Sequence, residues 1–200
     1  MGENHERAKH LLRLELRTAR QRLAPGEVLR LSKAACARVV ALPVFRAARH
    51  VVLYAPIDNE VDPSAIGTAA LGSGKAVYYP ATTRTGPGEP FVTRPGTQSR
   101  DAAATARALP PGATDVVFVV PGLGFDVRGA RLGRGDGWYD RALPRHPRGI
   151  RIGLAYEFQV VAFLPEAAWD VRMHSVVTEG RVLNGSPNGP GSEKETRPWR

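Results

Sequence analysis

Hydrophobic residues recur at three- and four-residue spacing in the N-terminal part of the chain. Between Glu6 and Leu23, this spacing is followed by Ala8, Leu12, Leu16, Ala19 and Leu23. This spacing predicts an amphipathic helix with one buried stripe. Pro25 and Gly26 interrupt the pattern, and residues 27–41 are predicted to form a second helix that ends before Pro43.

The period changes after residue 50, where short apolar runs replace the helical stripe. Strands are predicted at residues 50–55, 75–79, 91–93, 115–120, 150–155, 175–178 and 181–183. Helices are predicted at residues 64–71 and 101–109 and as short segments from about residues 138 and 157, and Asp62 and Pro63 supply the start of the first. Strands that are apolar throughout and alternate with helices are typical of parallel sheets. The predicted fold class is α/β, a single three-layer domain whose mostly parallel sheet carries helices on both faces.

Length and composition limit the domain organisation. The chain has 200 residues, of which 42% are hydrophobic, so it can build a core and is expected to form one domain over residues 1–183. Residues 184–200 are rich in Gly, Pro, Ser and Asn and are predicted to be a disordered C-terminal tail. Cys36 is the only cysteine, which excludes an internal disulfide and a multi-cysteine metal site, and we expect it to pack in the core.

The charge balance favours anionic partners. Lys and Arg number 28 against 19 Asp and Glu, giving a formal net charge of +9. The 24 arginines are dispersed and no nucleic-acid recognition motif is visible, so a nucleic-acid-binding module is the least supported hypothesis. No specific nucleic-acid partner is expected. No run approaches the roughly 18–20 apolar residues of a membrane span, and the N-terminus lacks a signal-peptide core. We therefore expect a cytoplasmic protein that binds no membrane, and we further predict a monomer.

Residues 121–141 carry the pattern with the clearest chemical meaning. They follow the strongest predicted strand and precede a helix, which is where open α/β sheets bind ligands. Gly133, Gly135 and Gly137 let the backbone approach a ligand, and Arg131 and Arg134 add positive charge. The pattern predicts a phosphate cradle, although it matches neither the Walker nor the dinucleotide motif. The alternative is a glycine-rich surface loop with solvated arginines.

The run from Val119 to Arg141 closely resembles the signature of the 5-formyltetrahydrofolate cyclo-ligase family. That family carries a Pro-Gly-x-x-Phe-Asp turn followed by an Arg-Leu-Gly-x-Gly-x-Gly-Tyr-Tyr-Asp loop, and this chain carries matching segments at residues 121–126 and 131–140. Lys9 and Arg13 match its N-terminal Lys-x-x-x-Arg. Further similar segments occur in the family's order at residues 59–62, 153–156, 159, 164–165, 169–170 and 177–179. The resemblance spans about residues 8–183.

The resemblance implies an ATP- and Mg²⁺-dependent conversion of 5-formyltetrahydrofolate to 5,10-methenyltetrahydrofolate through a phosphorylated formyl group. The implied nucleotide-binding residues are Lys9, Arg13, Arg131, Leu132, Gly133, Arg134, Gly135, Asp136, Gly137, Trp138 and Tyr139. Arg134 is the implied catalytic residue. Glu60, Arg134 and Trp138 would bind the folate, and Asp140 would bind Mg²⁺. The alternatives without a role in ligand binding are a solvated basic face for Lys9 and Arg13, and an ion pair of Asp140 with Arg141 or Arg145.

Four departures from the family pattern leave a second function open. Asp136 replaces a Gly or Lys, Trp138 replaces a Tyr, and His174 stands where the family often has a metal-linked acid. The methionine of a Met-x-Phe substrate segment is Glu89 here. The alternative is a cyclo-ligase-like homologue that binds ATP but acts on another acceptor or is non-catalytic. Trp169 is expected in the core rather than against a ligand.

Overall fold

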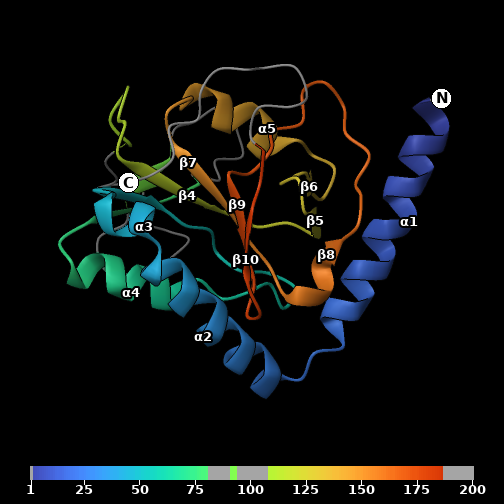
Figure 1. Cartoon of the computed structure of the whole chain (residues 1–200), viewed down its shortest axis with the longest axis horizontal. Helices are drawn as coiled ribbons and strands as arrows, with labels where there is room; N and C mark the ends of the chain where they lie inside the picture. The colour runs from blue at the N-terminus through green and yellow to red at the C-terminus, as the bar shows by residue number, and fades with distance from the viewer. Residues whose placement is uncertain (1, 81–90, 94–107, 187–200) are drawn as a thin grey trace.

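A seven-stranded sheet forms the centre of the computed structural model, which describes residues 2–80, 91–93 and 108–186 (Figure 1). Its strands, in spatial order, are β10 (Val182–Asn184), β9 (Ser175–Val177), β7 (Ile150–Leu154), β4 (Val116–Val120), β1 (His50–Val52), β2 (Ala76–Tyr79) and β3 (Val92–Thr93). Neighbouring strands from β9 through β2 are parallel, whereas the edge strands β10 and β3 pair antiparallel. The predicted mostly parallel α/β sheet is confirmed.

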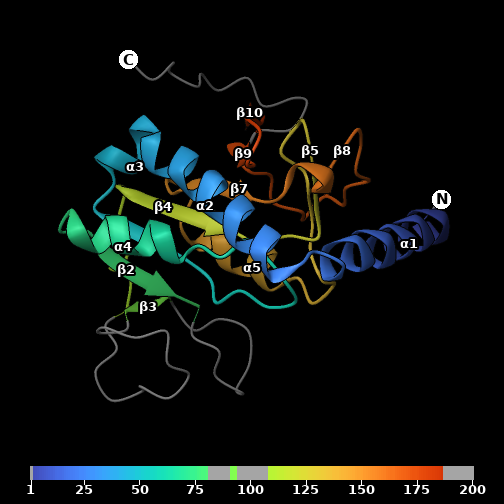
Figure 2. The same ribbon diagram turned by 90° about the horizontal axis from the view of Figure 1, so that it is seen from below.

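Helices cover both faces of this sheet (Figure 2). On one face lie α2 (Pro25–Ala41), α3 (Pro43–Ala47) and α4 (Ser64–Gly72), whose apolar side chains pack with the strands into one core cluster. On the other face α5 (Trp138–Ala142) and the 3-10 helix η1 (Leu143–Arg145) contribute to a second cluster. Two apolar faces explain why β4, with all five residues buried, has no polar positions.

A small second sheet and the N-terminal helix lie beside the main sheet (Figure 1). The small sheet has the order β6 (Arg131–Leu132), β5 (Gly124–Asp126) and β8 (Val160–Val161), and the 3-10 helix η2 (Glu157–Gln159) precedes β8. Helix α1 (Gly2–Gln21) packs on it through a cluster of Leu16, Ala130, Leu132 and Leu164. The glycine-rich segment 121–137 was predicted as a loop, which is wrong for β5 and β6. Strands of two or three residues show no alternation that a sequence pattern can detect.

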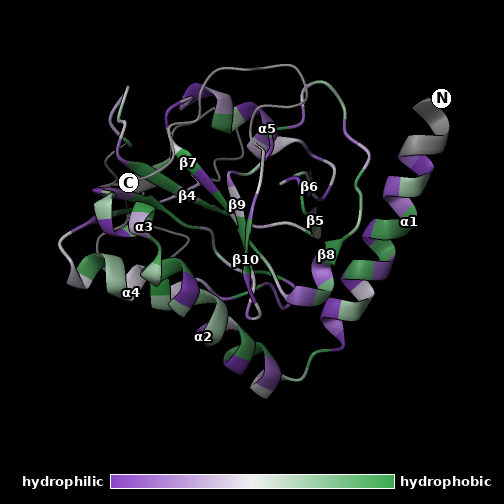
Figure 3. Cartoon of the chain, in the orientation of Figure 1, coloured by the Kyte–Doolittle hydropathy of each residue, from purple (hydrophilic) through white to green (hydrophobic). Residues whose placement is uncertain are grey.

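Figure 3 shows apolar residues interspersed with polar ones along α1. Within the predicted buried stripe, Leu16 is buried, whereas Ala8 is exposed. None of the described helices is long and apolar enough to cross a membrane. Several sequence boundaries differ from the prediction. Pro25 and Gly26 begin α2, because proline is well tolerated in the first helical turn. Asn184 belongs to β10 rather than to the tail, and residues 187–200 lie outside the described residues.

Two further expectations have different outcomes. The helix predicted at residues 101–109 lies almost wholly outside the described part of the chain, and its last two residues, Ala108 and Leu109, are not helical. Trp169 is 75% exposed, so the expectation that it lies in the core is wrong. Cys36 is buried on α2, as expected.

Candidate active site

A cavity of about 560 Å³ opens at the carboxyl ends of β1, β2 and β4. Its walls are Tyr54, Ala55, Ile57, Glu60, Tyr79, Pro80, Pro121, Gly122, Arg131, Gly133, Arg134, Asp136, Trp138 and Tyr139. Open α/β sheets bind ligands at this edge because the connections that leave the strands diverge there. The cavity therefore combines the predicted phosphate cradle with Glu60, which lies more than seventy residues earlier in the sequence.

Arg134 lines the cavity and forms ion pairs with two carboxylates. Its Nη1 lies 3.1 Å from Oδ2 of Asp58, and its Nη2 lies 3.3 Å from Oε1 of Glu60. Burial raises the pKa of the Glu60 carboxyl above its ordinary value, while Arg20 and Arg134 oppose that rise. The side chain of Glu60 is only 7% exposed. Glu60 is thus a buried acceptor held between two guanidinium groups.

Arg20 connects helix α1 to this wall. It is fully buried, and its Nε donates to the carbonyl of Asp58 at 2.8 Å while Nη1 donates to the carbonyl of Gly122 at 3.3 Å. Nη1 also lies 3.6 Å from Oε1 of Glu60. Burial lowers the pKa of Arg20, and Glu60 counteracts this effect. Arg20 therefore supplies a permanent positive charge behind the cavity.

The glycine segment adopts the backbone conformations that its composition predicts. Gly135 and Gly137 have φ angles of 112° and 63°, in the region that side-chain-bearing residues avoid. Arg13 of α1 donates from Nε to the carbonyl of Gly133 at 3.1 Å, so the helix holds the start of the loop. The carboxylate of Asp136 accepts the Trp138 backbone N–H at 3.3 Å. Asp136 therefore closes the loop locally, although it also lines the cavity.

Aromatic rings form the apolar wall of the cavity. Trp138 meets Phe91 edge-on with ring centroids 5.4 Å apart, and Tyr139 packs edge-on against Trp138 at 4.8 Å. Burial raises the pKa of the Tyr139 phenol well above its ordinary value, so Tyr139 stays neutral. A flat ligand ring could pack against this wall.

The chain is similar to proteins of one enzyme family. The model of the 5-formyltetrahydrofolate cyclo-ligase family matches residues 5–179. The chain belongs to this family. A 5-formyltetrahydrofolate cyclo-ligase of Escherichia coli is 28% identical over 84% of this chain and 98% of its own length. The solved structure of an Aquifex aeolicus 5,10-methenyltetrahydrofolate synthetase is 32% identical, covers 94% of this chain and 97% of its own, and has a TM-score of 0.73. A Mycoplasma pneumoniae 5,10-methenyltetrahydrofolate synthetase has a TM-score of 0.69 at 26% identity, over 86% and 98% of the two chains.

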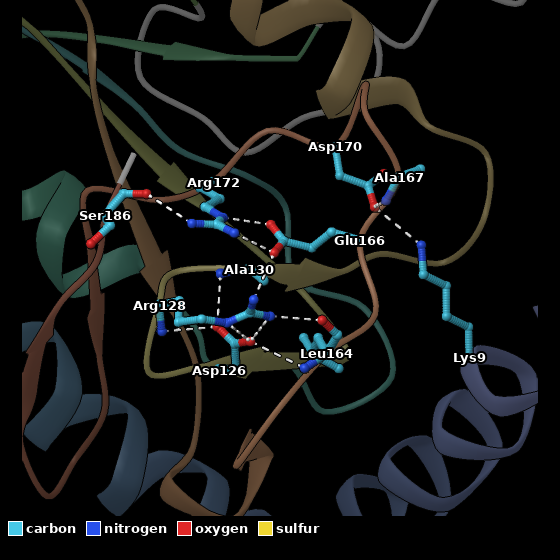
Figure 4. Close-up of polar contacts among 10 residues, drawn as sticks. All are labelled: Lys9, Asp126, Arg128, Ala130, Leu164, Glu166, Ala167, Asp170, Arg172 and Ser186. Carbon is cyan, nitrogen blue, oxygen red and sulfur yellow. Dashed lines mark hydrogen bonds and ion pairs between the residues drawn. The ribbon is translucent and has the colours of Figure 1, made fainter. Parts of the chain in front are cut away.

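The structure places some residues implied by the cyclo-ligase resemblance outside the cavity. Nζ of Lys9 lies 3.1 Å from Oδ2 of Asp170, which also accepts the Ala167 backbone N–H (Figure 4). Neither Lys9 nor Arg13 is among the cavity-lining residues. Both lie on the inner face of α1 rather than forming a solvated basic face, since Lys9 is only 9% exposed. The side chain of Leu132 packs against α1, so only its backbone faces the loop.

Asp140, the cyclo-ligase residue expected to bind Mg²⁺, is paired with Arg131. Its Oδ2 lies 2.7 Å from Arg131 Nη2, and its Oδ1 accepts the Val171 backbone N–H at 3.2 Å. The alternative pairing with Arg141 or Arg145 is therefore wrong. Among the described residues no group of three His, Cys, Asp or Glu could hold a metal ion. Asp140 is not among the cavity-lining residues. Mg²⁺ commonly uses one or two protein carboxylates together with ligand phosphates, so Asp140 would have to exchange Arg131 or the Val171 N–H for the ion to serve in that role.

His174 contacts the backbone of Arg151 and is not among the cavity-lining residues. Its Nδ1 accepts the Arg151 backbone N–H at 3.0 Å, so that nitrogen is occupied and unprotonated. Burial, with a smaller contribution from the charge of Arg151, lowers its pKa to about 4. Among the described residues His174 belongs to no cluster of His, Cys, Asp or Glu that could hold a metal ion. Glu89 and Pro90 lie outside the described residues.

Sequence reasoning missed Arg20 and Asp58. A signal for Arg20 does exist: Lys9, Arg13, Leu16 and Arg20 are spaced by four, three and four residues, which places them on one face of α1. Because Leu16 is buried, the three cations on that face point inward as well. Asp58 has no comparable signal, since its position depends on how the loop after β1 folds.

Proposed function

We propose that the chain converts 5-formyltetrahydrofolate to 5,10-methenyltetrahydrofolate with ATP and Mg²⁺, releasing ADP and phosphate. The observation that carries the proposal is the single cavity that joins the arginine- and glycine-rich loop to Glu60 and an aromatic wall. The arginine- and glycine-rich loop suits a triphosphate, whereas Glu60 and the aromatic wall suit a pterin. Family membership supports the assignment, because the relatives described above carry names for this activity.

The chemistry requires activation of a poor leaving group. The formyl oxygen at N5 cannot depart as oxide, so the γ-phosphoryl group of ATP is transferred to it and the bond to ADP breaks. N10 then attacks the formyl carbon, the C–O bond breaks, and inorganic phosphate leaves with both electrons of that bond as N10 loses its proton. Little covalent work is left for the protein. Its task is to position the two substrates and to neutralise charge.

The arginines and the loop backbone are suited to that task. Arg134 and Arg131 line the cavity and would contact phosphate oxygens, with N–H groups of the 133–137 backbone as further donors. Arg134 would meet the charge that develops during transfer, which is the proposed catalytic role. Lys9 and Arg13 would bind the phosphates from α1 in place of their present partners, Asp170 and the Gly133 carbonyl.

Glu60 and Trp138 would hold the folate. An ionised Glu60 can only accept hydrogen bonds, so it would orient the N–H groups of a pterin ring, and Trp138 would pack against the ring face. Mg²⁺ supplies charge neutralisation on the phosphates when bound, and Asp140 would be its protein ligand. The monomeric state and the cytoplasmic location stay predictions, as does the absence of a nucleic-acid partner.

Purified protein should form the methenyl chromophore from 5-formyltetrahydrofolate, ATP and Mg²⁺, with one ADP per product. Arg134→Gln should lower kcat by about 10²- to 10³-fold because it removes a charge-stabilising donor. Glu166→Gln is the matched control, since Glu166 is absent from the cavity wall. ATP binding without chromophore would reject this substrate and favour the alternative of another acceptor, which screening of formamides and carboxylates for ATP consumption would test.

A further inference from the structure

Arg134 is paired with two carboxylates, although the proposed function needs it on a phosphate. The two carboxylates are those of Asp58 and Glu60, at 3.1 and 3.3 Å. These two contacts use one N–H group on each Nη atom, so part of the donor set of Arg134 is already turned towards the carboxylates. Asp58 and Glu60 therefore compete with an anion for the charge and the position of Arg134.

Each carboxylate has a second arginine that belongs to helix α1. Arg17 Nη2 lies 3.1 Å from Oδ2 of Asp58, and Arg20 Nη1 lies 3.6 Å from Oε1 of Glu60. If Arg134 moves away, neither carboxylate loses its only positive neighbour. For Glu60 this matters most, because an unpaired charge at a 7% exposed side chain is costly.

The backbone of the loop after β1 fixes this arrangement. Asp58 and Asn59 have φ angles of 51° and 56°, a conformation that Asp and Asn adopt more readily than other residues with side chains. Asn59 donates from Nδ2 to the carbonyls of Arg20 and Leu23, and Arg20 donates back to the carbonyl of Asp58. The loop is thus tied to the end of α1, which keeps Asp58 facing both Arg17 and Arg134.

We propose that Asp58 is a positioning residue that competes with a phosphate of the nucleotide for Arg134, while Arg17 and Arg20 keep the two carboxylates neutralised when the phosphate draws Arg134 away. This inference rests on the proposed function for the identity of the anion. It makes Asp58 a competitor of the nucleotide, although Asp58 contacts no reacting atom. It also gives Arg17 and Asp58 opposite effects on nucleotide affinity.

The test is ATP affinity, measured by calorimetry in the unmodified protein and in Asp58→Asn. Asparagine keeps the positive φ and removes the charge. Exposed ion pairs are weak, so we expect two- to fivefold tighter ATP binding in Asp58→Asn and two- to fivefold weaker binding in Arg17→Gln, where Asp58 depends more on Arg134. In steady-state kinetics the change should fall on the KM for ATP, with kcat nearly unchanged.

The double variant Asp58→Asn with Arg134→Gln separates this mechanism from long-range charge effects. The gain from Asp58→Asn should disappear in the Arg134→Gln background, whereas any gain from the control Asp136→Asn should persist there. An equal gain for Asp58→Asn in both backgrounds would overturn the proposal. If Arg134→Gln binds ATP too weakly to titrate, the thermal stabilities of the two single variants and the double variant are measured without ligand. Additive effects of the substitutions at positions 58 and 134 on stability would overturn the proposal.

Two further outcomes separate this proposal from the function on which it rests. Titration with 5-formyltetrahydrofolate in place of ATP distinguishes a folate carboxylate from a phosphate as the anion that attracts Arg134. A gain with the folate and none with ATP would overturn the proposal. Absence of any ATP binding by the unmodified protein would reject the proposed function and the inference with it, whereas ATP binding that ignores position 58 would reject the inference alone.

Discussion

Arg131 and Asp140 form an ion pair across the base of the glycine segment, with 2.7 Å between Nη2 and Oδ2 and side chains only 6% and 17% exposed. Arg131 belongs to β6 and Asp140 to α5, so the pair joins the two ends of the loop at residues 133–137. The second oxygen of Asp140 accepts the Val171 backbone N–H. A carboxylate expected to meet a metal ion therefore also holds the loop in shape.

Asp140→Asn should reveal both roles. We expect the free energy of unfolding to fall by about 1.5–3 kcal/mol, because a charge-assisted hydrogen bond is lost in a mostly buried place. Urea unfolding measures this change. The Mg²⁺ concentration for half-maximal activity should rise at least tenfold, as is typical when a metal carboxylate is weakened. An unchanged Mg²⁺ dependence, alongside the loss of stability, would assign Asp140 to loop structure alone.

His174 should make the protein sensitive to acid. Its folded-state pKa of about 4 lies below the ordinary 6.5, so its contribution to stability is complete above pH 6.5 and is lost as the pH falls through about 4. At pH 4.5 the loss is about 2–3 kcal/mol. His174→Asn keeps an acceptor for the Arg151 N–H and removes the titration. Its stability should therefore decline less between pH 7 and 4.5, and an identical decline in both proteins would contradict the prediction.

Asp126 should be the most sensitive carboxylate outside the cavity. It is completely buried, and it accepts hydrogen bonds from the backbone and guanidinium of Arg128 and from the backbones of Ala130 and Leu164 (Figure 4). Asp126→Ala should lower the free energy of unfolding by about 3–5 kcal/mol, because Arg128 and two buried N–H groups lose a partner. The neighbouring Glu166→Gln, which leaves these N–H groups paired, should cost much less in the same urea titration.

The main sheet could be predicted because its strands are continuous and apolar. β4 is a run of five buried residues rich in valine, and no helix on the surface of a small domain has such a pattern. β5 and β6 could not be predicted, since strands of three and two residues within a glycine-rich segment depend on pairing with β8 and with each other. The local sequence does not determine how β5 pairs with β6 and β8.

The candidate site, like the fold, could be predicted only in part. The glycine and arginine segment could be located, because its residue types state a chemical role and its place after β4 follows from the fold. The partners of its side chains could not. Asp140 pairs with Arg131 at nine residues' distance rather than with either arginine considered, and Asp58 faces Arg134 from a loop seventy-six residues away. Such contacts depend on how separate loops pack, which no single segment determines.

Lys9 offers a final test of whether a buried cation serves structure or ligand. It is held by Asp170, outside the cavity wall, with the two side chains 11% and 19% exposed. If it serves only to fasten α1 to the 162–174 loop, Lys9→Met and Asp170→Asn should lower stability alike and leave ATP affinity unchanged. The proposed function requires more of Lys9, because a charge-assisted bond to phosphate is worth about 1.5–3 kcal/mol. We therefore expect Lys9→Met to weaken ATP binding by about tenfold or more. Asp170→Asn, which frees the ammonium group, should leave ATP binding unchanged or make it tighter. Calorimetry with ATP measures both affinities, and equal affinities in the two variants would remove Lys9 from the nucleotide site.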